Sequence, residues 1–249
     1  MRIELDPRII ARLLAAAIVL LVIASMIGQI STYYFGHGRL LGLVRLFALD
    51  EEGNVPTWYS SVTLLCCSAL LGLIAAAHGR DDRWWRHWAG LALVFLYLSM
   101  DEAASIHELS IEPLHDLLGV GGLLRWAWVV PGMLFLAVLA AAYLKFVSAL
   151  RRPTRRLFCT AAALFVGGAL VVEMLSGWWF DQYGNRNMGF VLLWTTEEAL
   201  EMTGVAVFIF ALLRHVRDEV GAIHFSLACR PEAACGRPAP VESIADSVS

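Results

Sequence analysis

The sequence predicts an all-α protein, built as a bundle of six transmembrane helices. The chain has 249 residues, of which 59% are hydrophobic and 16% are charged, whereas soluble domains carry roughly 25% charged residues. Its mean hydropathy is +0.65, and its apolar residues come in runs of about 20, the length that a helix needs to cross a bilayer. These observations exclude an ordinary soluble domain. The net charge of −3 and the position of the basic residues in the loops give no support to nucleic-acid binding.

Short connections separate the apolar runs, which cover about residues 9–30, 57–78, 87–109, 126–147, 157–179 and 188–213. The first run follows a basic start but lacks a clear small-residue cleavage site, so we expect an uncleaved helix rather than a signal peptide. Pro56 fits the first turn of the second span, and Pro113 is expected to end or kink the third. Residues 1–218 are therefore predicted to form one transmembrane domain. The Ala/Pro/Gly/Ser-rich residues 219–249 are predicted to form a disordered tail.

Lys and Arg are distributed unevenly between the connections. Thirteen lie at the N-terminus, in the second and fourth connections and at the end of the sixth span, whereas 4 lie in the other loops, leaving out the two arginines of the tail. Cytoplasmic loops carry the excess of basic residues in membrane proteins. The distribution therefore predicts that both termini are cytoplasmic.

Acidic side chains lie within, or at the outer edge of, three of the predicted spans. They are Asp101, Glu102 and Glu108 in YLSMDEAASIHE, Glu173 in VVEMLSGWW, and Glu197, Glu198 and Glu201 in WTTEEALEMTG. A charge at the centre of a membrane helix costs ~2.5–3.5 kcal/mol on insertion scales, so such residues are rare and usually functional. No Lys or Arg shares these segments, so protons, bound cations or His107 must supply the positive charge.

The direction of each helix places the acidic residues in the same, outer leaflet. At 100° per residue, one stripe of the third span carries Asp101, Ser105, Glu108 and Glu112. The simplest arrangement packs the third, fifth and sixth spans around an acidic pocket that opens outward. The acidic residues of the first outer loop, Asp50, Glu51 and Glu52, are expected to form a solvated face or the rim of this pocket. His78 and His87 are expected at the cytoplasmic interface and are not expected to be metal ligands.

The leading hypothesis is a divalent-metal site that supports chemistry on a lipid-like or periplasmic small molecule. Carboxylates with imidazole suit Zn, Mn or Fe, and helix bundles build metal sites from inward-facing Glu and His. The predicted ligands are Asp101, Glu102, His107, Glu108, Glu173, Glu198 and Glu201. A metal-bound water would then be the hydrolytic nucleophile. This hypothesis requires Asp101, Glu102, His107 and Glu201 to converge on one point.

Two other classes of function stay open. Clustered carboxylates at membrane depth also serve proton- or cation-coupled transport or sensing. A transporter requires a polar path to the cytoplasm, and six spans are few for a monomer, although a homo-oligomer such as a dimer would be adequate. Carboxylates that are dispersed, each hydrogen-bonded to a different helix, indicate instead a structural subunit of a membrane complex. The inner halves of these helices are apolar, which favours a one-sided site.

The segments LDEEGNVPTWYSS and LSMDEAASIHE resemble a pattern of uncharacterised bacterial polytopic inner-membrane proteins, with PTW-x-S and LS-x-DE-x4-HE motifs. The resemblance covers roughly residues 45–112. It implies a location in the bacterial inner membrane and no known activity.

Overall fold

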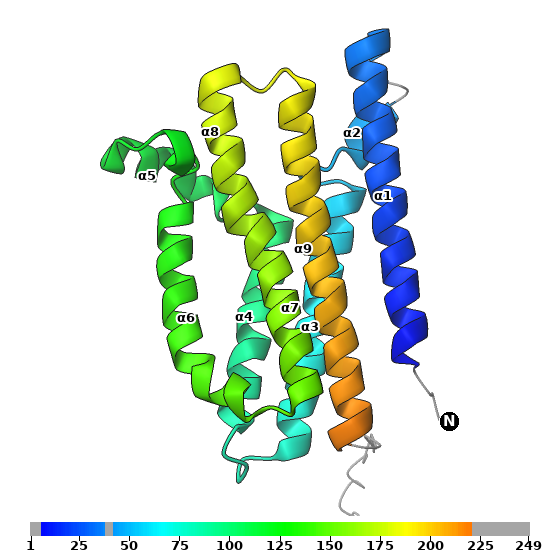
Figure 1. Cartoon of the computed structure of the whole chain (residues 1–249), viewed down its shortest axis with the longest axis vertical. Coiled ribbons are helices and arrows are strands. Elements are labelled where there is room, and N and C mark those ends of the chain that lie inside the picture. Colours follow the sequence, from blue (N-terminus) through cyan, green and yellow to red (C-terminus); the bar gives the residue numbers. More distant parts are fainter. Residues whose placement is uncertain (1–5, 38–41, 221–249) are drawn as a thin grey trace, which may run out of the picture.

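The computed structural model describes residues 6–37 and 42–220, and each regular element within them is a helix (Figure 1). The longer helices are α1 (Pro7–Phe35), α3 (Val55–His78), α4 (Trp85–Ala104), α6 (Val129–Ala149), α7 (Arg152–Val166) and α9 (Met188–His215). The shorter ones are α2 (Leu43–Phe47), η2 (Glu108–Ser110), α5 (Ile111–Leu118), η3 (Gly122–Leu124), η4 (Gly167–Val172), α8 (Glu173–Tyr183) and η5 (Val216–Val220). The prediction of an all-α fold is confirmed. The predicted tail lies almost entirely outside the described residues.

Five helices of the described chain are long and apolar enough to cross a membrane: Pro7–Phe35, Val55–His78, Val129–Ala149, Arg152–Tyr183 and Met188–Val220. Trp85–Ala104 and Glu108–Leu118 meet the same criterion together, with a bend of 74° between them, and counted as one span they give the sixth. Large apolar side chains on these helices are exposed, such as Leu20 at 67% and Leu144 at 70%. Such a surface is costly in water and suits contact with a lipid bilayer.

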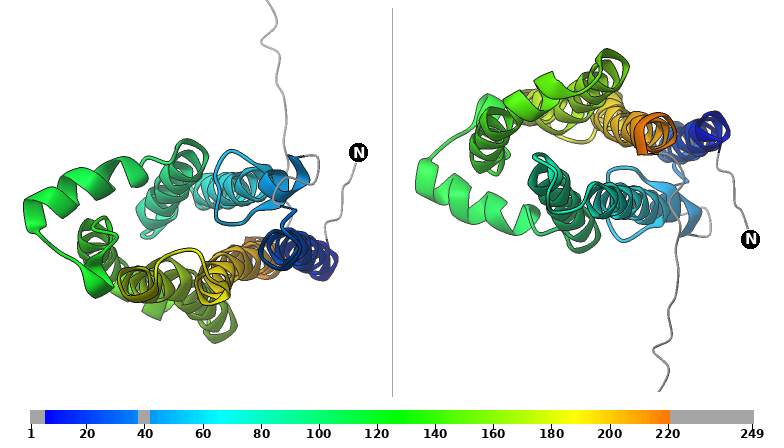
Figure 2. Two further views of the ribbon diagram at one scale, coloured as in Figure 1. Left: turned by 90° about the horizontal axis from the view of Figure 1, so that it is seen from above. Right: turned by 90° about the horizontal axis from the view of Figure 1, so that it is seen from below.

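The helices stand in two rows when the molecule is seen along its long axis (Figure 2). The helices α3 and α4 pack side by side in one row, and α1, α9 and the α7–α8 helix form the other. The helix α9 packs against α1, α3, α7 and α8. Residues on α9 therefore have neighbours from both rows, which makes this helix the centre of the bundle.

Charge distinguishes the two ends of the bundle. We call one the basic end, the lower end in Figure 1, because it carries Arg80, Arg83, Arg86, Arg151, Arg152, Arg155, Arg156, Arg214 and Arg217. We call the opposite region, where the α2–α3 loop meets the bend after α4, the acidic end; it carries Glu52, Asp101, Glu102, His107 and Glu108. Between them lies an apolar core in which Leu71, Ile74, Phe146 and Leu212 are fully buried.

The third span departs from the sequence prediction. The helix α4 ends at Ala104 because Ser105 adopts the left-handed conformation, with φ of 51°, that terminates helices. Pro113 does not interrupt a helix, since it lies in the first turn of α5, where its missing N–H is not needed. The predicted stripe that joined Asp101 to Glu108 is therefore wrong, because the 74° bend separates them.

The fifth span is a single long helix with an unusual centre. The α-helical parts α7 and α8 are joined by the π-helical segment η4, and π turns in helices are rare and often lie at functional sites. Gly168 of this segment lies against α9, where an added Cβ would be 2.7 Å from the backbone oxygen of Glu197 and 2.8 Å from Cγ of Glu201. The absence of a side chain at this glycine therefore permits the close approach of η4 to α9.

Candidate functional site

His107 is fixed by the turn that ends α4. Asp101 accepts two hydrogen bonds from it, one from the backbone N–H to Oδ1 at 2.8 Å and one from ring Nδ1 to Oδ2 at 2.9 Å. A left-handed residue other than glycine, here Ser105, costs roughly 1–2 kcal/mol, and these bonds offset that cost. Because a carboxylate can only accept, Nδ1 carries the proton and Nε2 presents its lone pair in the neutral ring. Asp101 therefore sets both the orientation and the tautomer of His107.

Glu52 reaches the same place from the loop between α2 and α3. Asn54 organises this loop, because its Nδ2 donates to the backbone oxygens of Ala48 at 2.6 Å and Glu51 at 2.7 Å. Its Oδ1 accepts from the backbone N–H of Thr57 at 3.2 Å and so caps the first turn of α3. The sequence DEEGN thus forms a structured loop that turns Glu52 toward the bend after α4.

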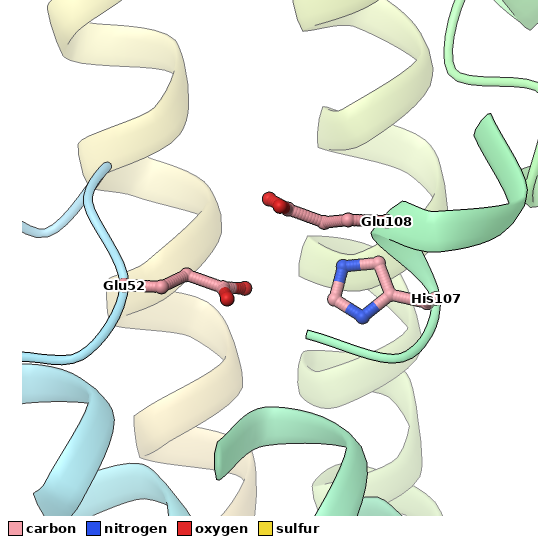
Figure 3. Close-up of side chains that lie close together, drawn as sticks. All are labelled: Glu52, His107 and Glu108. Atoms are coloured by element: carbon pink, nitrogen blue, oxygen red, sulfur yellow. The ribbon is translucent and has the colours of Figure 1, made fainter. Parts of the chain in front are cut away.

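Glu52, His107 and Glu108 come together at the acidic end (Figure 3). One ligand atom from each residue lies within 4.8 Å of those of the other two. Glu52 and His107 are half-buried and Glu108 is exposed. The Oε2 atom of Glu52 is buried and has no hydrogen-bond partner among the described residues. A buried carboxylate oxygen without a partner is costly unless a proton or a cation satisfies it.

The charges of this group favour a cation. Burial raises the pKa of Glu52, and the negative charge of Glu108 raises it further, while His107 opposes the rise. Burial and the negative charge of Glu108 both penalise the ionised form of Glu52. A divalent ion between the two carboxylates would reverse that penalty, because it is the largest local charge in such a site. Two carboxylates and one imidazole form a donor set that suits Zn, Mn or Fe.

The predicted ligands occupy different positions around this group. His107 and Glu108 belong to it, and Asp101 lies behind His107 as its hydrogen-bond partner. Of the four residues expected to converge on one point, His107 alone is part of the group. Glu102, Glu198 and Glu201 are half-buried, and their side chains interact electrostatically with one another. They form a second layer of carboxylates on α4 and α9.

Glu173 is the first residue of α8, directly after the π-helical segment. Its Oε1 accepts a hydrogen bond from Nε1 of Trp128 at 2.8 Å. The Trp128 ring in turn lies 5.0 Å from the ring of His107, centroid to centroid. Glu173 therefore supports the indole that packs against His107, and this contact joins α8 to the candidate site.

Glu52 is the residue that sequence reasoning placed only in a solvated face or a rim. The available signal was topological, since the loop with DEEGN and the bend with SIHE both belong to the outer side of the predicted bundle. The packing of α3 against α4 brings this loop and this bend into contact. Sequence spacing alone does not specify this packing.

Comparison with known proteins gives one relationship. No curated protein and no solved structure matches the chain. A family model described as a domain of unknown function, DUF8692, matches residues 12–216. The matched region runs from α1 to the end of α9 and contains all three residues of the acidic-end group. Because the match covers most of the chain, this protein belongs to the family of domains of unknown function DUF8692.

Proposed function

We propose that this protein binds a divalent metal ion between Glu52, His107 and Glu108 and uses it for chemistry at the outer side of a bacterial inner membrane. The observation that carries the proposal is the approach of the three ligand atoms to within 4.8 Å of one another. His107 would bind through Nε2, because Nδ1 is held by Asp101. Three protein ligands leave a coordination position for water or substrate, as in catalytic metal sites. Zn, Mn and Fe are the ions that this donor set suits.

The surrounding residues have distinct roles in this proposal. Asp101 positions His107, since a ligating histidine usually donates its second ring N–H to a carboxylate or carbonyl. Glu102 is proposed as a general base beside the site, because it interacts electrostatically with Glu52, His107 and Asp101. A divalent metal held by Glu52, His107 and Glu108 would supply an activated water for hydrolysis. Glu198 and Glu201 extend this network of carboxylates into α9.

The interior below the carboxylates supports a one-sided site rather than a transport path. Met202, Val205 and Ala206 follow Glu201 along α9 and are all buried. The apolar core continues from there to the basic end. An ion would have to cross this apolar region to pass through the bundle, which is expensive without polar groups. A substrate is therefore expected to meet the metal from the acidic end or from the bilayer.

The decisive experiment measures metal content by mass spectrometry in protein purified in detergent and reconstituted with Zn, Mn and Fe. We expect near-stoichiometric metal in the unmodified protein and a loss of at least tenfold in Glu52→Gln and in His107→Ala. Glu51→Gln is the matched control, because Glu51 belongs to the same loop but is exposed and pairs with Arg45 at 3.1 Å. Thermal melting verifies that each variant is folded.

Two results would overturn the proposal. One is that the unmodified protein retains none of the three metals after reconstitution. The other is that Glu51→Gln lowers the metal content as much as Glu52→Gln does, since this would show nonspecific binding to an acidic loop.

A further inference from the structure

The basic end contains a cavity whose chemistry differs from that of the acidic-end group. Its volume is about 120 Å³, and the residues around it include His78, Trp84, Trp88, Phe146, His215 and Glu219. These side chains come from α3, the start of α4, α6, α9 and η5. They are far apart in the sequence and meet only because α3 packs against both α4 and α9. The proposed metal site involves none of them.

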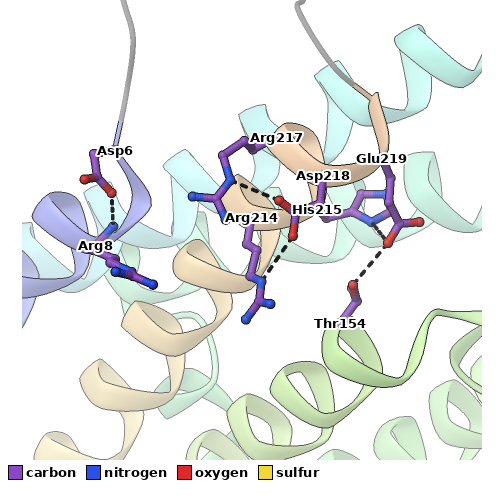
Figure 4. A network of polar contacts seen from close by, with 8 residues as sticks. All are labelled: Asp6, Arg8, Thr154, Arg214, His215, Arg217, Asp218 and Glu219. Carbon is purple, nitrogen blue, oxygen red and sulfur yellow. Dashed lines mark hydrogen bonds and ion pairs between the residues drawn. The ribbon is translucent and has the colours of Figure 1, made fainter.

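Two imidazoles, the half-buried His78 and the buried His215, each have an unused hydrogen-bonding atom here. His78 donates from Nδ1 to Asp82 Oδ2 at 3.2 Å, so its Nε2 carries the lone pair in the neutral ring. His215 is 2% exposed, and its Nδ1 lies 3.3 Å from Oε1 of Glu219 (Figure 4). Within residues 6–37 and 42–220, the Nε2 atoms of His78 and His215 are buried without a hydrogen-bond partner. Such groups cost free energy unless a ligand or water satisfies them.

Aromatic rings form much of the remaining wall. The Trp88 ring lies 6.1 Å from the ring of His78 at an interplanar angle of 10°, and 4.8 Å from that of His215. Phe146 meets Trp88 edge to face at 4.9 Å. Cavities of roughly 150 Å³ lined by apolar side chains hold a benzene ring. The volume of about 120 Å³ therefore suits one small flat ring, partly outside the mouth.

The charges around the cavity do not select an ion of either sign as its ligand. Glu219 and Arg151 are both part of the wall, and Asp82 lies behind His78, so the cavity is flanked by charges of both signs. Among the described residues, the His and carboxylate atoms of this end do not approach one another as a group of three in the way that those of the acidic end do. A neutral ligand that supplies an O–H or N–H donor satisfies the imidazoles best.

We propose that this cavity binds a small phenolic ring of the hydroquinone type, with the ring against Trp88 and a hydroxyl donating to Nε2 of His78 or His215. The ring face of such a molecule would stack on the aromatic wall. The hydroxyls at the ring edge would donate hydrogen bonds to the imidazole nitrogens. A site built to hydrogen-bond a hydroxyl discriminates strongly against an analogue that lacks it. The ligand is therefore expected to require its O–H groups, and not only its ring.

The test is ligand-observed NMR of hydroquinone with the full-length protein in detergent, with empty micelles as the blank. We expect saturable binding that weakens at least tenfold in His215→Phe and in His78→Phe, each of which keeps a ring but loses the acceptor. His87→Phe is the matched control, because the His87 ring also stacks on Phe146, at 5.4 Å, and has a buried unpartnered Nδ1, but does not line the cavity. Binding to this control should equal that of the unmodified protein.

A further variant covers the case in which the buried substitutions prevent folding. Ala149 lines the cavity and is exposed, so Ala149→Phe fills the mouth without replacing a buried side chain and should abolish binding. The ligand-side control is 1,4-dimethoxybenzene, which keeps the ring but has no donor. Equal binding of this analogue, equal binding to Ala149→Phe, or stronger binding of inorganic phosphate at the same cavity would each overturn the proposal.

Discussion

At the acidic end, Asp101 holds the imidazole of His107 at 2.9 Å, and the ring faces Glu52 and Glu108. At the basic end, Asp82 holds the imidazole of His78 at 3.2 Å, and the ring faces Trp88. The same carboxylate–imidazole pair thus occurs in two settings. Because the carboxylate fixes the tautomer in both, we expect the neighbours of the free nitrogen to determine which ligand each end binds. Carboxylate neighbours favour a metal cation, and aromatic neighbours favour a flat organic donor.

Loss of the supporting carboxylate should give the largest difference between the two ends. Asp101→Asn presents an N–H to Nδ1 of His107 or loses its bond, so metal affinity should fall about 10–100-fold, the usual effect of removing such a partner. Asp82→Asn should weaken hydroquinone binding only a few-fold, since the aromatic contacts persist. Titration of both variants with Zn and with hydroquinone provides the measurement. The two ends would not be independent sites if Asp101→Asn changed hydroquinone affinity, or if Asp82→Asn changed metal affinity, by more than the experimental error.

A change in helix packing should disturb the acidic end selectively. Gly168→Ala places a Cβ within 2.7 Å of the Glu197 backbone oxygen, and overpacking of this kind costs about 1–3 kcal/mol. Thermal melting in detergent should show the loss of stability, and metal affinity should fall while hydroquinone affinity does not. Gly72→Ala is the control, since a Cβ there meets nothing within 4 Å. A Gly72→Ala variant as unstable as Gly168→Ala would contradict this account of the packing.

The smallest effect concerns pH and the metal-free protein. Burial raises the pKa of Glu52, so folding favours the protonated form, and this contribution to stability is lost as the pH rises through the raised value. Glu52→Gln cannot ionise, so without metal it should melt higher than the unmodified protein at pH 8, by about 1 °C, and equally at pH 4. The shift is small because Glu52 is partly exposed to solvent. Melting curves with chelator check this, and added metal should reverse the order.

Long apolar runs were sufficient to predict the architecture, because the length and hydropathy of a membrane helix are properties of the local sequence. A helix of the structure overlaps each of the predicted runs, although α6 begins only at Val129. The third span was predicted to end near residue 109, because Pro113 is a helix-breaking residue and Ser105 is not. In the structure α4 ends earlier, at Ala104. The break at Ser105 has no Gly or Pro of its own; it is stabilised by the two hydrogen bonds to Asp101. Propensity rules do not include a bond of this kind.

The sites depend on packing between segments that are distant in the chain. Glu52 meets His107 only after α3 has packed against α4, and His78 meets His215 only after α9 has packed against α3. Charge and helix direction predicted which residues share an end of the bundle. They did not specify which side chains face one another, because rotation of a helix about its axis depends on the whole interface.

The π turn at residues 167–172 has a mechanical consequence. Such a turn holds more residues than an α turn, and a shift of one residue in an α-helix corresponds to a rotation of 100°. Conversion of this turn to α geometry would therefore swivel α8 relative to α7 and carry Glu173 away from Nε1 of Trp128. The π turn therefore sets the rotation of α8 about its axis, and with it the position of the Glu173 carboxylate that holds Trp128 beside His107.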